Sequence, residues 1–196
     1  MNVFGLVLAG GLASRLGGDK AMRLVNGQTL LAHALAILSP LCEALGVSTG
    51  TRTLPLPPAV QAVPDLEPFV MQGPLSGLYA GLKASRAADA ETMLVLACDL
   101  PNVSMPLLQR LLRELVGYDV VFCEHAGLPE PLVCALRVQP MLKAVESSLA
   151  AGSLRVVPLW KNSRCRLLHD FDLAEFAPLE KTFANINTPE DLAREQ

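Results

Sequence analysis

A glycine-rich segment carries the clearest chemical signal in this sequence. Residues 8–20 read LAGGLASRLGGDK and directly follow an apolar stretch. Their four glycines allow backbone N–H groups to turn toward one anion, and Arg15 and Lys20 add two positive charges. Such a loop after a strand of an α/β sheet is where phosphates normally dock. Spacing alone leaves open the alternative of a glycine-rich turn with two solvated cations.

Two familiar phosphate-binding loops do not fit this segment. Walker A requires Lys and Ser or Thr after its second glycine; Gly5 and Gly10 have the right spacing, but Gly11 and Leu12 follow. The dinucleotide fingerprint G-x-G-x-x-G is absent because Gly10 and Gly11 are adjacent and the next glycine is Gly17. The sequence therefore indicates neither a P-loop NTPase nor a dehydrogenase.

Asp99 is the second candidate for chemistry. It follows the apolar stretch Thr92–Ala97, and a carboxylate at the tip of a buried strand faces the same crevice as the glycine-rich segment. Such an oxygen ligand suits Mg²⁺, which binds through one or two carboxylates plus substrate phosphates. The structural alternative is an aspartate that caps the next turn, favoured by Pro101 and Asn102.

Two further segments carry weaker signals. Residues 73–77, GPLSG, either place backbone N–H groups beside a base or ribose or simply begin a helix. Near the other end, residues 188–191 are explained as a helix cap followed by Pro and two carboxylates. That explanation leaves out Asn185 and Asn187, two amides on one face of an extended segment, which could bind a polar ligand.

No nucleophile or general base stands out. The three histidines, His33, His125 and His169, have no Ser or Asp partner at a recognisable spacing. The sequence offers phosphate contacts and one metal-binding carboxylate.

Composition restricts the class of ligand. Of 196 residues, 51% are hydrophobic and 18% charged, with a formal net charge of −3. A charged fraction below the roughly 25% of globular proteins excludes a disordered chain. The negative net charge argues against nucleic acid or an anionic membrane as partner, so an anionic ligand needs a small local site. Length predicts one domain over residues 1–196.

The cysteines and the apolar runs bear on the compartment. Five widely spaced cysteines indicate buried thiols in a reducing cytoplasm rather than disulfides or a zinc site. No apolar run reaches the ~18 residues that cross a bilayer. Residues 3–13 imitate a signal segment but have no Lys or Arg before them. We therefore expect a cytoplasmic protein without a membrane partner.

Short apolar stretches alternate with amphipathic ones, and the strands and helices that they predict must position the candidate site residues. Val3–Leu8 and Thr92–Ala97 are continuously apolar, as in strands buried on both faces of a parallel sheet. Further strands are expected at residues 46–51, 120–123, 132–136, 155–160 and 166–169, a proline-rich loop at 53–68, and helices at Leu30–Leu38, 74–88, 106–115, 139–150 and 189–194. This alternation predicts an α/β domain with a mostly parallel central sheet.

Six motifs in order carry a family resemblance: LAGGLASRLGGDK, GPLSGL, LACDLP, PLVCAL, AGSLRV and FANINTPEDLA. Over nearly the whole chain they resemble the molybdenum cofactor guanylyltransferases, in the MobA-like branch of the nucleotidyltransferases. Leu-Ala-Gly-Gly and Gly-Pro-Leu-x-Gly favour the guanylyl branch, since cytidylyl relatives tend to show Leu-Ala-Ala-Gly. The resemblance implies a single Rossmann-like three-layer domain of the nucleotide-diphospho-sugar transferase type.

The resemblance also implies a reaction and its residues. Enzymes of this family transfer GMP from Mg-GTP to the terminal phosphate of molybdopterin and release pyrophosphate. Arg15, Lys20 and Asp99 would be catalytic, with Asp99 holding Mg²⁺ or, alternatively, Mn²⁺. The nucleotide would contact Leu8, Ala9, Gly10, Gly11, Lys20, Thr51, Asp65, Gly77 and Asp99; Arg155, Asn185 and Asn187 would lie toward the pterin. Transient contacts with other cofactor-biosynthesis proteins or with molybdoenzyme apoproteins are implied as well.

One departure from the family pattern affects the nucleotide contacts. Where relatives often have an Asn-containing segment after the second strand, residues 48–52 read STGTR, and Thr51 is the substitute contact. Two alternatives stay open: a related enzyme that uses CTP or another acceptor phosphate, and a non-catalytic nucleotide-binding protein that delivers cofactor. The presence of Arg15, Lys20 and Asp99 together argues against the latter, because binding alone would not require all three.

Overall fold

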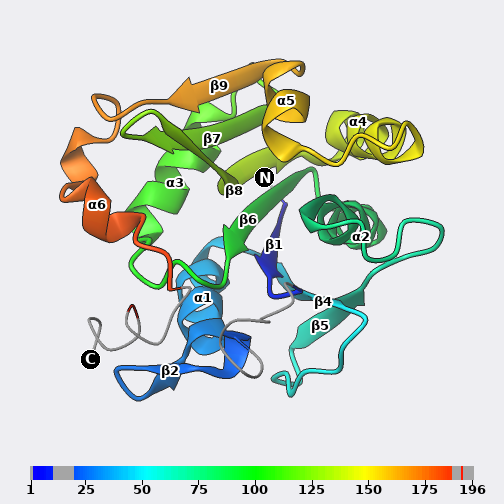
Figure 1. Ribbon diagram of the computed structural model, residues 1–196, viewed down its shortest axis with the longest axis horizontal. Helices are drawn as coiled ribbons and strands as arrows, with labels where there is room; N and C mark the ends of the chain where they lie inside the picture. Colours follow the sequence, from blue (N-terminus) through cyan, green and yellow to red (C-terminus); the bar gives the residue numbers. More distant parts are fainter. Residues whose placement is uncertain (1, 11–19, 187–190, 192–196) are drawn as a thin grey trace.

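The computed structural model describes residues 2–10, 20–186 and 191, and within them a seven-stranded sheet forms the centre of the molecule (Figure 1). Its strand order is β5-β4-β1-β6-β8-β7-β9. The strands are β1 (Val3–Leu8), β4 (Ala44–Gly50), β5 (Val60–Pro64), β6 (Thr92–Ala97), β7 (Val120–His125), β8 (Leu128–Arg137) and β9 (Cys165–Leu168).

The sheet has a parallel half and a mixed half. Strands β5, β4, β1 and β6 are parallel to one another, whereas β8 is antiparallel to both β6 and β7, and β9 is parallel to β7. The predicted α/β fold with a mostly parallel sheet is confirmed. Because the four parallel strands point the same way, the segments after them meet at one edge of the sheet.

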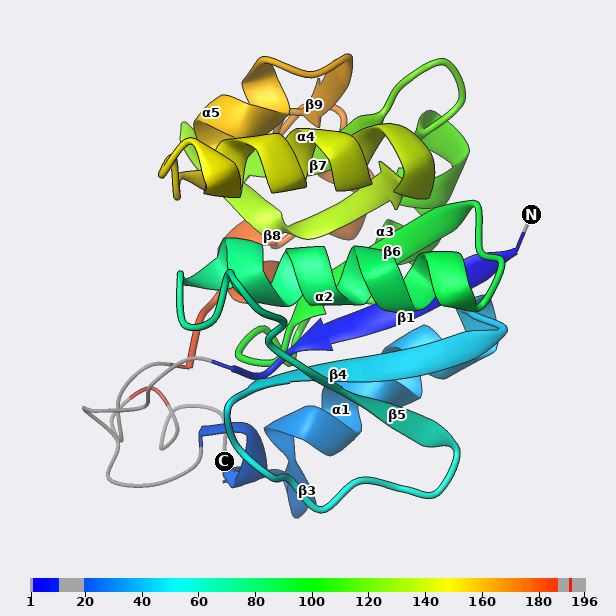
Figure 2. The same cartoon turned by 90° about the vertical axis from the view of Figure 1, so that its right-hand side faces the viewer.

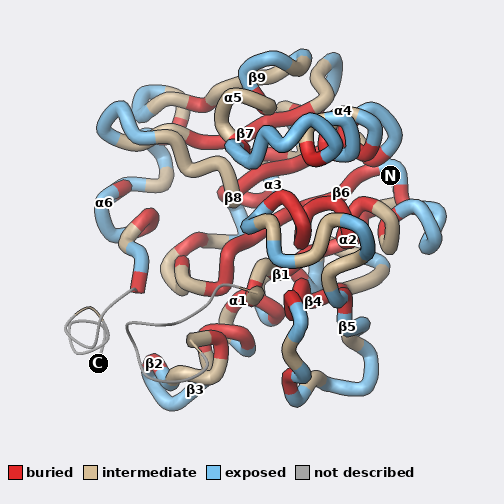
Figure 3. The backbone as a smooth tube through the Cα atoms, turned by 45° about the vertical axis from the view of Figure 1, so that its right-hand side comes forward, coloured by how far each residue is buried: buried red, intermediate tan, exposed pale blue. Residues whose placement is uncertain are grey.

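Helices cover both faces of the sheet and give three layers (Figure 2). Helices α1 (Leu30–Leu38) and α3 (Met105–Glu114) pack on one face, and α2 (Pro74–Ala87), α4 (Val138–Ala150) and α5 (Val156–Lys161) on the other. Each face has its own apolar core, one containing Leu35 and Leu108 and the other Leu78 and Trp160. In Figure 3 the inner strands β1 and β6 are buried, while exposed positions gather on loops, on outer helix faces and on the edge strand β5.

Local chemistry explains where several helices begin. The Thr29 hydroxyl accepts a hydrogen bond from the Ala32 N–H at the start of α1, and Ser104 does the same for Leu107 at the start of α3. Helix α2 begins with Pro74, whose missing N–H is not needed in a first turn.

Two expectations about secondary structure are wrong. The predicted loop at 53–68 contains β5, because a strand at the edge of the sheet tolerates prolines beside it and at its end. The predicted strand at 155–160 is instead α5, in which Pro158 lies in the first turn and Val156 and Trp160, four residues apart, bury the same face.

Several short elements were not expected. They are β2 (Leu24–Val25), β3 (Gln28–Thr29), α6 (Leu179–Thr182) and the 3₁₀ turns Lys20–Met22, Ser39–Leu41 and Ala174–Phe176. The predicted helix at 189–194 lies largely outside the described residues. Among the described residues no helix is both long and apolar enough for a membrane span, and no disulfide joins the five cysteines.

Candidate active site

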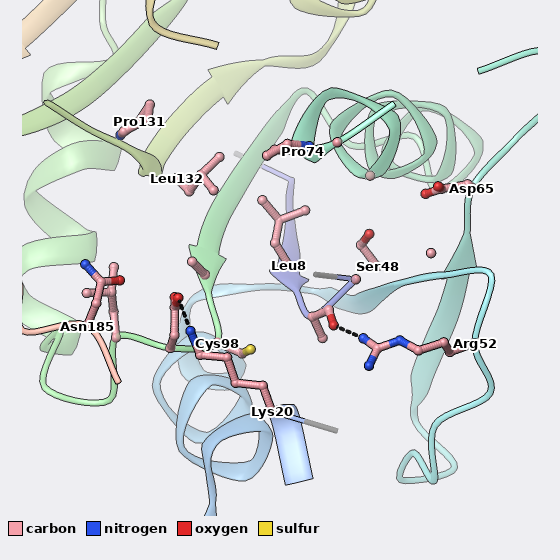
Figure 4. A pocket seen from close by; sticks show the side chains of 18 of the residues that line it. Leu8, Lys20, Ser48, Arg52, Asp65, Pro74, Cys98, Pro131, Leu132 and Asn185 are labelled. Atoms are coloured by element: carbon pink, nitrogen blue, oxygen red, sulfur yellow. Dashed lines mark hydrogen bonds and ion pairs between the residues drawn. The ribbon is translucent and has the colours of Figure 1, made fainter. Parts of the chain in front are cut away.

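A cavity of about 460 Å³ opens at the edge of the sheet where the parallel strands end (Figure 4). Its lining comes from the ends of β5, β4, β1 and β6 and continues to β8, five neighbouring strands of the sheet. Adjacent strands lie about 4.8 Å apart, so the cavity runs past about 19 Å of sheet edge. A cavity of this volume and length has room for parts of two ligands side by side.

Lys20 and Asp99 form an ion pair in the middle of this cavity. The Lys20 Nζ donates a hydrogen bond to Asp99 Oδ2 over 2.7 Å, and both side chains are only partly exposed. Lys20 lies in the first turn after the glycine-rich segment, and Asp99 comes after β6. The predicted meeting of these two charges is therefore observed.

The β5–β4 side of the cavity is lined by residues at the ends of these strands, and we call it the nucleotide end because the family resemblance implies nucleotide contacts there. Thr51 and Arg52 come after β4 and Asp65 comes after β5. The Arg52 guanidinium donates a hydrogen bond to the carbonyl oxygen of Ala9, which joins the ends of β4 and β1. Asp65 accepts a hydrogen bond from the backbone N–H of Met71 over 2.9 Å, which holds the loop leading toward α2.

Gly77 lets helix α2 approach the nucleotide end closely. A Cβ atom on Gly77 would collide with the Ser48 Oγ and would lie only 3.0 Å from a Leu8 methyl carbon. Any larger residue would therefore push the helix away from the ends of β1 and β4. Gly77, the second glycine of GPLSG, is therefore needed for packing, and it also lines the cavity.

The opposite side is built by an irregularity in β8, and we call it the acceptor end because the family resemblance implies that Asn185 lies toward the pterin. Phe122 of β7 pairs with Cys134, but the next residue, Cys123, pairs with Glu130, so residues 131–133 of β8 have no partner in β7. Glu130, Pro131 and Leu132 all line the cavity as a result, which regular alternation along a strand would not allow. The buried Trp160 holds this bulge, because its Nε1–H donates to the Pro131 carbonyl over 3.0 Å.

Glu130 brings a second carboxyl group near Asp99. Burial raises its pKa above the ordinary value, the charge of Asp99 raises it further, and His125 acts in the opposite direction. No hydrogen bond or ion pair involves the Glu130 side chain within the described part of the chain.

The segment after α6 completes the acceptor end. The Ile186 N–H donates to the Asp99 carbonyl over 2.9 Å, and the Ile186 side chain is buried with Val25 and Leu30. Asn185 consequently lines the cavity, and Figure 4 places it on the same side as Pro131 and Leu132, across from Arg52 and Asp65.

The structure brings most of the predicted site residues together. The cavity is lined by Leu8, Ala9, Gly10, Lys20, Thr51, Asp65, Gly77, Asp99 and Asn185. Arg155 is exposed at the start of α5 and is not among the lining residues. Gly11, Arg15 and Asn187 lie outside the described residues.

Sequence reasoning missed part of the site. Ser48, Arg52 and residues 130–132 line the cavity but were not assigned a ligand contact. Arg52 and Ser48 belong to the segment in which the chain departs from the family pattern, which was their available signal. Pro131 and Leu132 begin the motif PLVCAL, which was their available signal, whereas Glu130 had none, because β-bulges leave little trace in a sequence.

The fold and the site together define a class of protein. A parallel sheet edge with a glycine-rich segment, a lysine and an aspartate around a long cavity is typical of α/β enzymes that bind phosphorylated ligands at strand ends. The chain belongs to the family of the MobA-like NTP transferase domain, whose model matches residues 5–161.

Relatives match over nearly the whole chain. The molybdenum cofactor guanylyltransferase of Cereibacter sphaeroides is 35% identical over 195 residues, which cover 99% of this chain and 95% of that protein. A probable molybdenum cofactor guanylyltransferase of Pelotomaculum thermopropionicum is 30% identical over 190 residues, with 97% and 90% coverage.

Solved structures share the fold. The molybdopterin-guanine dinucleotide biosynthesis protein A of Archaeoglobus fulgidus superimposes with a TM-score of 0.78 at 24% identity, covering 98% of this chain and 96% of that one. A Mycobacterium tuberculosis protein, solved in complex with manganese, has a TM-score of 0.60 at 14% identity, with 100% and 98% coverage.

Proposed function

We propose that the protein transfers GMP from GTP to the terminal phosphate of molybdopterin, forming the guanine dinucleotide cofactor and pyrophosphate. The observation that carries the proposal is the Lys20–Asp99 pair in the middle of a cavity that passes five strands. A charged centre with room on both sides suits a reaction between two phosphorylated substrates. The names of the full-length relatives support GTP as donor and molybdopterin as acceptor.

Asp99 fits a magnesium ion that arrives with GTP, with Mn²⁺ as an alternative. Its carboxylate is partly buried, lines the cavity and lies beside a lysine that can bind phosphate. Mg²⁺ commonly uses one or two carboxylates together with substrate phosphates and water. A bound ion would offset the negative charge of the triphosphate.

The position of each remaining residue in the cavity decides which substrate we assign to it. Backbone groups of residues 8–11 would hold the phosphates, Lys20 would neutralise the triphosphate, and Arg15 would assist it. The nucleotide would contact Thr51, Asp65 and Gly77 at the nucleotide end. Asn185, together with Asn187 and Arg155, would serve the pterin side.

This reaction needs no general base from the protein. A phosphate monoester is largely a dianion at neutral pH because its second pKa is about 6. Its oxygen attacks the α-phosphorus of GTP, the bond between the α-phosphorus and the bridging oxygen breaks, and pyrophosphate leaves with that oxygen. The protein has to align two anions and reduce their repulsion, which Lys20 and backbone N–H groups can do.

Incubation with labelled GTP, Mg²⁺ and molybdopterin tests the reaction. We expect the guanine dinucleotide and pyrophosphate as products, and a larger increase in Tm with Mg-GTP than with Mg-CTP. Dinucleotide formed from CTP would show the cytidylyl alternative. Nucleotide binding without any transfer would show the delivery protein instead.

Lys20→Ala tests the role of the lysine. We expect weaker GTP binding and slower transfer, because the triphosphate loses a charged partner. Lys143→Ala, which removes an exposed lysine from α4, is the matched control and should leave both unchanged. Unchanged GTP affinity and turnover in Lys20→Ala would contradict the assigned role.

A further inference from the structure

Glu130 is a carboxyl group of the cavity that the roles above do not use. It is partly buried, it directly precedes the bulged residues 131–133 of β8, and within the described residues its side chain makes no hydrogen bond or ion pair. Withdrawing a carboxylate from water without providing donors costs free energy. A ligand that supplies N–H donors would recover that cost.

The position of Glu130 excludes a phosphate as its partner. Asp99 and Glu130 both line the cavity, so two carboxyl groups already share this part of it. A phosphate beside Glu130 would add a third, whereas Lys20 offers the cation that a phosphate requires. The partner of Glu130 is therefore a cation or a hydrogen-bond donor, and its apolar neighbours Pro131 and Leu132 favour the donor.

The neighbours of Glu130 indicate the shape of that donor. Pro131 and Leu132 give the acceptor end an apolar wall, and Asn185 adds an amide at its rim. A flat heterocycle can lie on such a wall and direct its edge to the carboxylate. The 2-amino-4-oxopyrimidine ring of a pterin carries two adjacent N–H donors, and two carboxylate oxygens accept from such a pair in a bidentate manner.

We propose that Glu130 binds the amino-pyrimidinone edge of the pterin and thereby selects the acceptor substrate, an inference that rests on the proposed function. Trp160 is a positioning residue in this arrangement, because its hydrogen bond to the Pro131 carbonyl fixes the bulged residue that follows Glu130. Guanine presents the same pair of donors, but the proposed contacts for the base, Thr51 and Asp65, lie after β4 and β5, on the far side of β1 and β6 from β8.

Glu130→Gln should change which ring the protein prefers. Pterin has two donors at this edge, whereas lumazine has one N–H and one carbonyl, which match the oxygen and the amino group of a glutamine. We expect the affinity of the wild-type protein for pterin to exceed its affinity for lumazine about 10-fold or more. In Glu130→Gln this preference should be lost or reversed. Fluorescence titration of the two compounds measures it without GTP. Equal affinities in wild type, or no binding of either compound, overturn the assignment.

Steady-state kinetics with GTP and molybdopterin give the second measurement. In Glu130→Gln we expect the KM for molybdopterin to rise about 10-fold or more, while the KM for GTP and the Mg²⁺ dependence stay as in wild type. Glu91→Gln, an exposed residue just before β6, is the matched control. A raised KM for GTP would place Glu130 on guanine, and a changed Mg²⁺ dependence would place it on the metal; either overturns the proposal. If wild type forms no dinucleotide, the proposed function fails, while the titration still tests Glu130.

Discussion

The two ends of the cavity are built in different ways. The nucleotide end consists of residues that come immediately after parallel strands, with small residues such as Gly10 and Gly77 and backbone atoms exposed toward the ligand. The acceptor end consists of side chains on a bulged strand and on a segment near residue 186. The first follows from parallel strand ends alone, whereas the second also needs an irregular strand and a segment from much later in the chain.

The difference shows how one sheet can serve two ligands. Parallel strands point their ends to one edge, so phosphate contacts there need little more than glycines and one lysine. Strand β8 runs antiparallel to β6, so its first residues extend past the end of β6 at this same edge, and the irregularity opposite Cys123 brings the consecutive residues 130–132 to the cavity. The consequence is that variants at one end should leave the affinity for the other substrate unchanged.

Asp99→Asn should have the largest effect, because Asp99 lies between the ends and serves both. We expect GMP transfer to fall at least about 100-fold with the fold intact, since the amide is a poorer magnesium ligand. Steady-state assays and circular dichroism check this. Asp89→Asn, a surface residue beyond α2, should have wild-type activity. Substantial transfer by Asp99→Asn would remove this residue from the metal site.

Gly77→Ala should disturb only the nucleotide end. The added methyl group would collide with Ser48 and Leu8, which costs about 1–3 kcal/mol of unfolding free energy and weakens GTP binding. Denaturant unfolding and GTP titration measure the two effects. Gly117→Ala is the control for stability alone, because Gly117 has a φ of 85° but open space around it. A GTP affinity that falls equally in both variants would show a general loss of stability rather than a local one.

Trp160→Phe should disturb only the acceptor end. Loss of the Nε1–H donor to Pro131 costs about 1 kcal/mol and loosens the β8 bulge. The KM for molybdopterin should increase by a smaller factor than in Glu130→Gln, with the KM for GTP constant. Tyr79→Phe, which removes the hydrogen bond from Tyr79 to Glu146, is the matched control. An equal change in both Michaelis constants would contradict the separation of the ends.

Asp170→Asn should have the smallest effect, because Asp170 is not among the residues that line the cavity. A hydrogen bond from His125 and one from the Ala126 N–H hold the pKa of Asp170 below its ordinary value. The carboxylate therefore stabilises the fold above its unfolded pKa, and this contribution is lost as pH falls through the lower folded pKa. We expect a small decrease in Tm at neutral pH that disappears in acid. A difference in Tm that is the same at every pH would contradict this origin.

Sequence reasoning recovered the nucleotide end better than the acceptor end, for physical reasons. The composition of Val3–Leu8 and Thr92–Ala97 predicts buried strands, and the residues after such strands must lie at the sheet edge, which placed Lys20 and Asp99 correctly. The contact between Arg52 and Ala9 depends on the register of β1 against β4, which composition does not encode.

The errors arose where tertiary packing outweighs local preference. Val156 and Val157 favour a strand, but burial of Trp160 against β8 selects a helix. The prolines around β5 led to the prediction of a loop, but a strand at the edge of the sheet tolerates prolines. Glu130 could not be found, because the bulge that turns it toward the cavity depends on how β8 packs between β6 and β7.

The hydrogen bond between Ile186 and Asp99 has a consequence for biosynthesis. A ribosome makes residues 8–99, which carry the nucleotide end, well before residues 185 and 186. We therefore expect a nascent chain to contain all residues of the nucleotide end while the acceptor end still lacks Asn185 and Ile186. The backbone carbonyl of Asp99 receives its hydrogen bond only after Ile186 has been made, so the acceptor end is completed after the nucleotide end.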